Sequence, residues 1–273
     1  LLYQFLSQLY SNVSTYVPDR YKEGYGISFQ GIDYAVDNDV SLIITLDCGI
    51  KGHEKVQYAK GKGIEMIITD HHTPAETLPK AVAVLNPKRA DCTYPYKELC
   101  GCGIGFKLIQ ALCKSLQLPS HTPYEFLDLV ALATCADIVP ITGENRVLVY
   151  FGLRQINEQP SQVMTLLLAS VPPPIQVRDL VFVAAPRINA AGRMAHAQKA
   201  VDFLTQNALE EVSCLEFLNH KRKGADEQIT QEALEQIVSN HEEEASATVV
   251  FSKDWHKGVI GIVASRLTET YYR

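Results

Sequence analysis

Two short apolar stretches of this chain, residues 40–46 and residues 65–69, each run directly into residues that could bind a metal ion. The candidate ligands are Asp47 after the first stretch and Asp70, His71 and His72 after the second. Carboxylate and imidazole groups without thiolates suit divalent cations such as Mn²⁺ or Mg²⁺. A pair of such ions can activate water and screen the charge of a phosphate under attack. The residue types therefore favour metal-assisted hydrolysis.

The elements that must position these groups alternate between strand and helix. The pattern predicts strands at 14–17, 40–46, 65–69 and 81–85, with a helix capped by Ser28 and another over 53–60. This alternation is typical of an α/β fold with a parallel, doubly wound sheet. Ligands of such sheets bind at the carboxyl ends of the strands. We therefore expect the candidate ligands to meet at one sheet edge.

From residue 101 to about 205 the pattern becomes mainly helical. Glycines at 101, 103 and 105 precede an apolar run at 106–112, which predicts a glycine-rich turn that enters a helix. Such a helix N-terminus can hold a phosphate, but the spacing equally suits a tight entry to a packed helix. A further helix predicted at 124–136 ends at Asp137, a polar residue among apolar neighbours that needs a partner or an exposed position.

The last third of the chain carries a different set of polar groups. Residues 186–193 (Pro-Arg-Ile-Asn-Ala-Ala-Gly-Arg) place two arginines around small residues. Their guanidinium groups suit phosphate, although surface salt bridges are the simpler explanation. We predict a catalytic domain at 1–205, a polar connecting helix at 206–243, and a second domain that starts at 244–273 with a strand at 248–251.

Composition sets the outer limits. The 273 residues are 47% hydrophobic and 21% charged, as in ordinary globular proteins, and the net charge of -6 argues against a broadly basic nucleic-acid-coating surface. Seven scattered cysteines suit reduced thiols in the cytoplasm better than a disulfide framework. Without a signal peptide or a long apolar run, we expect an intracellular protein and no membrane partner.

Simpler explanations exist for each candidate. The Asp-His-His run could be a capped turn, but Asp47 after a matching strand argues against that. Most other histidines have the pattern of surface residues, whereas His256, between the one tryptophan and Gly258, is harder to dismiss. A serine or cysteine hydrolase is poorly supported, because no Gly-x-Ser-x-Gly elbow occurs and Cys48 has no evident base nearby.

The motifs in combination resemble those of the DHH phosphoesterase superfamily, and within it the RecJ branch of single-strand-specific 5′ to 3′ DNA exonucleases. The resemblance runs nearly end to end. The superfamily motifs are at 46–49, 69–72 and 136–140, and the RecJ-like ones are at 16–20, 23–26, 187–193 and 255–266.

The resemblance implies a role for each candidate residue. Asp47 would bridge two Mn²⁺ or Mg²⁺ ions, and His71 and Asp137 would ligate one of them. Asp70 would either ligate an ion or orient a ligand from outside the coordination shell, and His72 would face the scissile phosphate. The substrate phosphate would be held by Arg193 with Asn189, while His256 would belong to a second domain that closes over the nucleic-acid groove.

The same resemblance implies release of 5′-mononucleotides from single-stranded DNA in repair and recombination, with single-strand-binding protein or a helicase as partners. The aspartate pair of the family's first motif would precede Leu1, so we expect the chain as given to bind metal weakly and to be catalytically poor. Two alternatives stay open. The chain could act on short oligonucleotides, cyclic dinucleotides or pyrophosphate, or it could be a degenerate module without catalysis.

Overall fold

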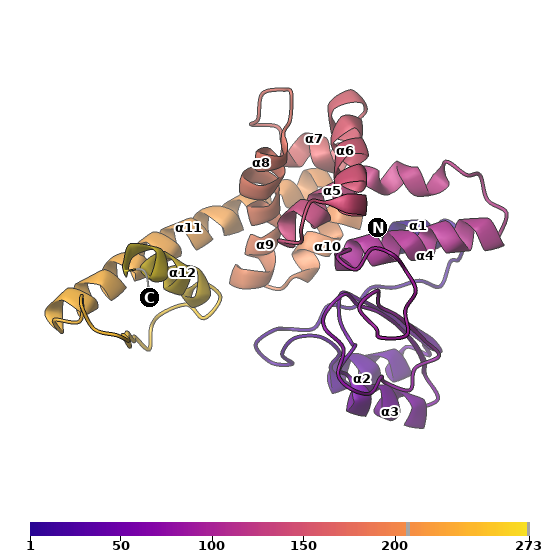
Figure 1. The fold of residues 1–273 in the computed structure, drawn as a ribbon, viewed down its shortest axis with the longest axis horizontal. Helices are drawn as coiled ribbons and strands as arrows, with labels where there is room; N and C mark the ends of the chain where they lie inside the picture. The colour runs from indigo at the N-terminus through magenta and orange to yellow at the C-terminus, as the bar shows by residue number, and fades with distance from the viewer. Residues whose placement is uncertain (206–207, 272–273) are drawn as a thin grey trace. The chain divides into compact units, whose positions relative to one another are not determined.

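A computed structural model describes residues 1–205 and 208–271 of the chain. The described residues form two compact units, Leu1–Ala185 and Pro186–Arg273, and each unit is described below by itself (Figure 1). None of the helices that these residues form is long and apolar enough to cross a lipid bilayer.

The first unit contains a parallel sheet of three strands. Its strands are β1 (Leu42–Leu46), β2 (Glu65–Thr69) and β3 (Ala83–Leu85), in the order β1-β2-β3. The register pairs Ile44 with Ile67 and Ile68 with Val84. Three of the four predicted strands are therefore confirmed, although β1 and β3 each begin two residues later than expected.

Two helices cover one face of the sheet and two others cover the opposite face (Figure 1). Met66 and Ile68 are buried in a core formed with α2 (Phe29–Asp37) and α3 (His53–Gly61), where Ile43 and Val84 also pack. The Ser28 hydroxyl caps α2 as predicted, accepting a hydrogen bond from Gly31 N at 2.9 Å.

On the other face, Ile44 packs against buried Phe5 and Ile109. These come from α1 (Leu2–Leu6) and α4 (Gly101–Ser115). Because successive residues of a strand point to opposite faces, the apolar run of β1 supplies side chains to both cores. The prediction of a doubly wound α/β sheet is confirmed.

A helical region completes the first unit. Its elements are η1 (Thr122–Phe126), α5 (Leu127–Ala136), α6 (Gly143–Glu158), α7 (Gln162–Leu167), α8 (Val177–Asp179) and η2 (Leu180–Ala184). The α5 helix is buried along most of its length and packs closely against α6. At this crossing a Cβ on Gly152 would lie 2.2 Å from the carbonyl oxygen of Leu127, so only glycine lets the two helices come so near.

Two predictions in the first unit are wrong. Residues 14–17 form no strand, because Tyr16 packs on the ring of Tyr34 and donates to Glu23 instead of pairing with a neighbouring strand. The glycines at 101, 103 and 105 form no turn before a helix, since all three lie inside the first turns of α4.

The second unit is helical. Its elements are α9 (Ala185–Met194, whose first residue closes the first unit), α10 (Gln198–Thr205), α11 (Ala208–Ser239) and α12 (Ile260–Tyr271). The first two residues of the predicted connecting helix at 206–243 lie outside the described part of the chain. For the described residues, α11 confirms the prediction of a long helix. The core of this unit includes Ile229, Val259 and Val263.

The prediction of a strand at 248–251 is wrong: these residues are described, and they form no strand. Phe251 forms two backbone hydrogen bonds of the kind a strand makes, but its partner is the side-chain amide of Gln236 on α11, at 3.0 and 3.1 Å. Val249 and Phe251 are 83% and 75% exposed. An alternating apolar pattern does not reveal whether a neighbouring strand is present to pair with it.

Candidate metal centre

The sheet brings two of the predicted ligand groups to one edge, as the sequence indicated. Asp47 follows β1, and its backbone N donates to Thr69 O at 2.9 Å, which extends the pairing of β1 with β2 by one residue. Asp47 has a left-handed backbone conformation with φ of 63°, which is uncommon outside glycine but tolerated by aspartate. This turn of the backbone directs the chain away from the sheet just where the carboxylate is needed.

The third contribution comes from the end of α5. Asp137 is the C-cap residue, and its backbone N donates to Ala133 O at 3.0 Å. Ile138 then takes φ of 56° and is 95% exposed. Glycine usually holds this position after a helix, so the β-branched residue there indicates local strain beside the candidate site.

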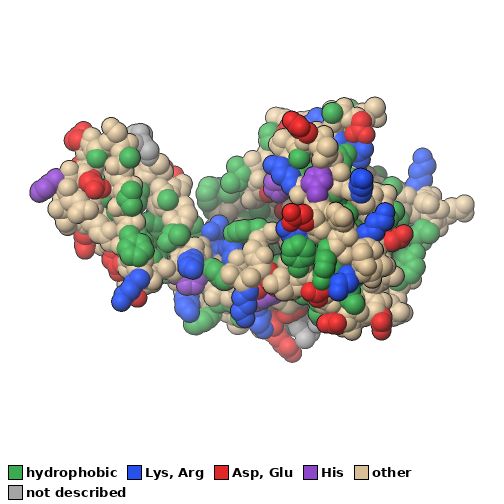
Figure 2. All heavy atoms as spheres, turned by 90° about the horizontal axis from the view of Figure 1, so that it is seen from below, with side chains coloured by type: hydrophobic (Ala, Val, Ile, Leu, Met, Phe, Trp, Pro, Cys, Tyr) green, Lys and Arg blue, Asp and Glu red, His purple; other side chains and the backbone are tan. Residues whose placement is uncertain are grey.

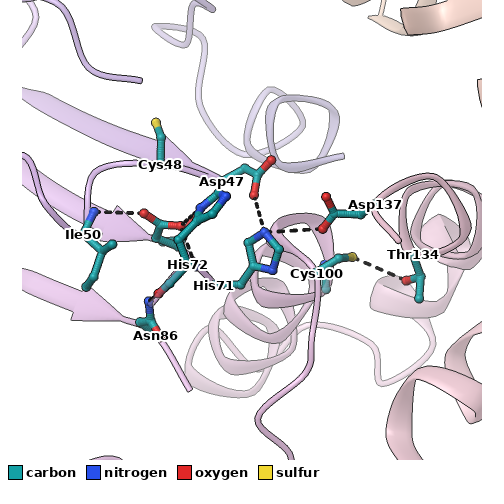
Figure 3. Close-up of polar contacts among 12 residues, drawn as sticks. Asp47, Cys48, Ile50, His71, His72, Asn86, Cys100, Thr134 and Asp137 are labelled. Carbon is teal, nitrogen blue, oxygen red and sulfur yellow. Dashed lines mark hydrogen bonds and ion pairs between the residues drawn. The ribbon is translucent and has the colours of Figure 1, made fainter. Parts of the chain in front are cut away.

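His71 lies between the two carboxylates. Its Nε2 is 3.0 Å from Asp47 Oδ1 and 3.4 Å from Asp137 Oδ2, so both acids point at the same ring nitrogen (Figure 3). These are ion-pair contacts and not hydrogen bonds: both ring nitrogens and Asp137 Oδ2 are buried without a hydrogen-bond partner. Buried polar atoms of this kind are rare in folded proteins and call for a specific explanation.

Electrostatics in this cluster favour an added cation. The contact with Asp47 raises the pKa of His71, against the opposing effect of burial. Burial raises the pKa of Asp137, which the nearby Asp47 charge raises further and the His71 ring lowers. Two carboxylates and one imidazole thus share a partly desolvated place, where a positive charge would relieve their repulsion.

The adjoining residues form hydrogen bonds of ordinary geometry. Asp70 Oδ2 accepts from Ile50 N at 2.9 Å, and Oδ1 accepts from both His72 N at 3.1 Å and His72 Nδ1 at 2.7 Å. Burial alone would raise the pKa of Asp70, but these donors together hold it below its ordinary value. Asn86 Nδ2 donates to His72 O at 2.9 Å, which anchors the same turn to β3.

The donor set fits a divalent metal ion. Asp47, His71 and His72 each offer a ligand atom, and these atoms all lie within 4.8 Å of one another. This is the one such group that the described residues form. Its nitrogen and oxygen ligands suit Mn²⁺ or Mg²⁺, and the buried atoms without hydrogen bonds are the ones a cation would engage.

The structure adds two residues that the sequence did not single out: Ile50 and Asn86 hold the Asp-His-His turn in place. Their only sequence signals are their positions after the ends of two strands. Gly101, predicted to lie in a glycine-rich turn, instead lies directly against Asp47. Cys48 takes no part: burial, with the Asp70 and Asp47 charges, raises the pKa of its thiol to about 12, so it is a poor nucleophile.

Apart from His72, the predicted substrate-binding residues lie in the second unit. Arg193 Nη1 donates to Gly258 O at 3.2 Å, and His256 Nδ1 accepts from Gly258 N at 3.1 Å, so Gly258 joins the two. Asn189 is exposed on α9, one turn before Arg193. Arg187 forms an ion pair with Glu216 at 3.7 Å, which favours the structural explanation for that arginine.

A second charged cluster in this unit had no counterpart in the sequence reasoning. Buried Asp226 on α11 accepts from Arg266 on α12 at 2.8 Å and lies 3.8 Å from Arg222. Burial lowers the pKa of Arg222, as do the nearby charges of Arg193 and Arg266, while Asp226 opposes the shift. Elsewhere Lys and Arg side chains are interspersed with Asp and Glu on the face shown in Figure 2.

Comparison with known proteins agrees with this geometry. A family model described as the DHH family, N-terminal domain, matches residues 1–134. A crystal structure of exonuclease RecJ bound to manganese superimposes with a TM-score of 0.88 at 34% identity, covering 100% of this chain and 69% of that one. The chain belongs to the RecJ branch of the DHH family.

Other members of the RecJ branch show how far the similarity extends. The RecJ exonuclease of Salmonella typhimurium is 38% identical over 96% of this chain and 49% of its own length. That of Bacillus subtilis is 38% identical over 98% of this chain and 34% of its own length. RecJ in complex with Mn²⁺ from Thermus thermophilus has a TM-score of 0.85 and 33% identity, covering 100% of this chain and 40% of that one. The chain thus spans half or less of the length of these curated relatives.

Proposed function

We propose that this chain carries the catalytic site of a metal-dependent exonuclease that digests single-stranded DNA from the 5′ end and releases 5′-mononucleotides. The observation that carries the proposal is the cluster of His71 and Asp137, buried beside Asp47 without hydrogen bonds at the carboxyl edge of the sheet. Relatives at 38% identity are named single-stranded-DNA-specific exonucleases, which supports the choice of substrate.

The metal would be Mn²⁺ or Mg²⁺, with two ions in the active site. Asp47, His71 and Asp137 are the residues that would hold them, since their side chains converge and those of His71 and Asp137 have buried atoms without hydrogen bonds. Bound divalent ions supply Lewis acidity to the phosphate and acidify a coordinated water molecule. The related structures were described with manganese and with magnesium, which supports this choice of ions.

Asp70 and His72 act as a pair in this proposal. The Asp70 carboxylate accepts from Nδ1 of His72 and so fixes the tautomer and the plane of the ring. The His72 side chain is 60% exposed, which leaves its Nε2 edge for the substrate. When protonated, Nε2 donates to a phosphate oxygen and stabilises the charge that develops there.

Residues of the second unit would bind the DNA strand. Arg193 and His256 share Gly258 as a partner, and Asn189 lies one turn away from Arg193 on the same helix. A guanidinium group and an imidazole held this way can contact successive phosphates.

The test is digestion of single-stranded oligonucleotides labelled at the 5′ or the 3′ end, with Mn²⁺ or with EDTA. We expect the 5′ label to appear at once as mononucleotide and the 3′ label to pass through a ladder of shorter products, only with metal. His72→Ala should lose mononucleotide release, whereas His121→Ala, which changes a histidine whose side chain is 74% exposed, should not. Digestion that persists in EDTA or in His72→Ala would contradict the proposal. Activity confined to dinucleotides would favour an oligonucleotide phosphodiesterase.

A further inference from the structure

The α4 helix begins with a glycine that lies against Asp47. Gly101 is its first residue and follows the N-cap Cys100. Glycine is the least favourable residue in a helix after proline, so its presence there asks for a reason. The same helix contains Gly103 and Gly105, which allow a direct comparison within one element.

Only the first of the three glycines is required by its surroundings. A Cβ placed on Gly101 would lie 2.4 Å from Asp47 Oδ1 and 2.6 Å from Asp47 Cβ and Cγ. The nearest atoms would be 3.4 Å away at Gly103 and 3.7 Å away at Gly105, which are ordinary van der Waals distances. A methyl group fits at the latter two positions and collides at the first.

Asp47 has little freedom to avoid such a collision. Its Cβ is among the atoms that would be struck, and the position of that atom is set by the backbone. The backbone in turn is fixed by the left-handed φ of 63° and by the hydrogen bond from Asp47 N to Thr69 O. An added methyl group must therefore either displace the carboxylate or push α4 away from the sheet.

The oxygen nearest to Gly101 is also the oxygen that faces His71. Asp47 Oδ1 is the atom 2.4 Å from the hypothetical Cβ and the atom 3.0 Å from His71 Nε2. It lies at the N-terminal end of α4, where the helix dipole favours a negative charge. The small volume of Gly101 thus lets one carboxylate oxygen approach the helix end and the imidazole together.

We infer that Gly101 is a positioning residue: by having no side chain, it admits the Asp47 carboxylate against the start of α4 and fixes Oδ1 beside His71. The consequence for metal binding rests on the proposed function, whereas the contact itself does not. An alanine at 101 moves a ligand atom of the metal centre without removing any ligand.

The contact is tested without metal. In EDTA, Gly101→Ala should lower the melting temperature by several degrees, whereas the matched change Gly105→Ala in the same helix should leave it unchanged or raise it. Asp47→Gly removes all three atoms that the methyl group would strike. In the Asp47→Gly background, Gly101→Ala should no longer lower the melting temperature. If Gly101→Ala alone does not fold, adding Asp47→Gly should restore folding. An equal loss in both backgrounds would overturn the inference.

The positioning role is tested by Mn²⁺ titration, followed by the electron paramagnetic resonance signal of free Mn²⁺. Gly101→Ala should weaken binding at least about tenfold, the range for residues that orient metal ligands, and Gly105→Ala should not change it. Unchanged affinity in folded Gly101→Ala would overturn the inference. Failure of the unsubstituted protein to bind Mn²⁺ would instead contradict the proposed function, and the coupling in EDTA would still decide whether Gly101 admits the carboxylate.

Discussion

The two halves of the candidate metal centre, one on each side of His71, differ in how their carboxylates are hydrogen-bonded. Asp70 accepts hydrogen bonds from Ile50 and His72 with both of its oxygens. Asp137, on the other side of His71, has a buried oxygen without any hydrogen bond. The difference indicates two roles. A satisfied carboxylate, whose oxygens both accept hydrogen bonds, holds its neighbours in place, and an unsatisfied one is available to bind a metal ion.

The pKa directions follow the same division. Burial is the largest single influence on both acids, and taken alone it would raise the pKa of each. For Asp70 the backbone and imidazole donors outweigh burial, so the pKa falls below its ordinary value. Asp137 has no such donors and has the Asp47 charge nearby, so its pKa stays raised despite His71. Hydrogen-bond donors, and not burial, therefore distinguish the two.

The largest effect should come from the unsatisfied half. Asp137→Asn removes a charge that the fold does not stabilise, so we expect the melting temperature in EDTA to be unchanged or higher. Mn²⁺ affinity should fall by more than about a hundredfold, because Asp137 is a proposed ligand and about a hundredfold is the upper end for residues that only orient ligands. Calorimetric titration with Mn²⁺ measures it, with exposed Asp37→Asn as the matched control. A stability loss with intact Mn²⁺ affinity would reverse the roles of the two halves.

The Asp70→Asn substitution should change folding stability and not the ligands of the metal. The amide replaces one acceptor oxygen with a donor that faces a backbone N–H, and that group then lies buried without a partner. We expect a loss of about 2–3 kcal/mol of unfolding free energy. Urea denaturation in EDTA measures it. Equal stability of the variant and the unsubstituted protein would show that the hydrogen bonds of Asp70 do not hold this half together.

The smallest effect is expected from Glu23→Gln, which tests whether a carboxylate with a full set of hydrogen bonds also stabilises the fold away from the metal centre. Glu23 accepts from Tyr16 OH at 2.8 Å, Ser28 Oγ at 2.6 Å and Asp19 N at 2.9 Å. Burial opposes these donors, yet they keep the pKa of Glu23 below its ordinary value. Glu23→Gln should cost about 1 kcal/mol and leave Mn²⁺ affinity unchanged.

Glu23 also predicts the sign of a pH effect. Because its folded pKa lies below the unfolded value of 4.5, its contribution is complete above that value and is lost as the pH falls through the folded pKa. The stability difference between the unsubstituted protein and Glu23→Gln should therefore shrink in acid below pH 4.5. A difference that grows in acid would contradict this assignment.

Local pattern and parallel topology were sufficient for much of the site. The apolar runs of β1 and β2 predicted two strands, and parallel strands end at one edge, so Asp47 and the Asp-His-His run had to be neighbours. Asp137 was singled out as a polar residue at the end of an apolar helix, and the family resemblance gave it the role of a ligand beside them. Strands were wrongly predicted at 14–17 and 248–251, because the pattern of a strand is local while the partner that completes it is not.

Only the tertiary structure decided how the groups at that edge differ. Which carboxylate is satisfied depends on donors brought from Ile50 and His72, and which one is left unsatisfied depends on where the end of α5 meets His71. The need for glycine at 101 depends on a contact with Asp47 across 54 positions of chain. The amino-acid pattern was enough to predict which chemical groups gather in the candidate metal centre. Their hydrogen bonding and close packing were decided by the tertiary fold, because both depend on distances between elements far apart in the chain.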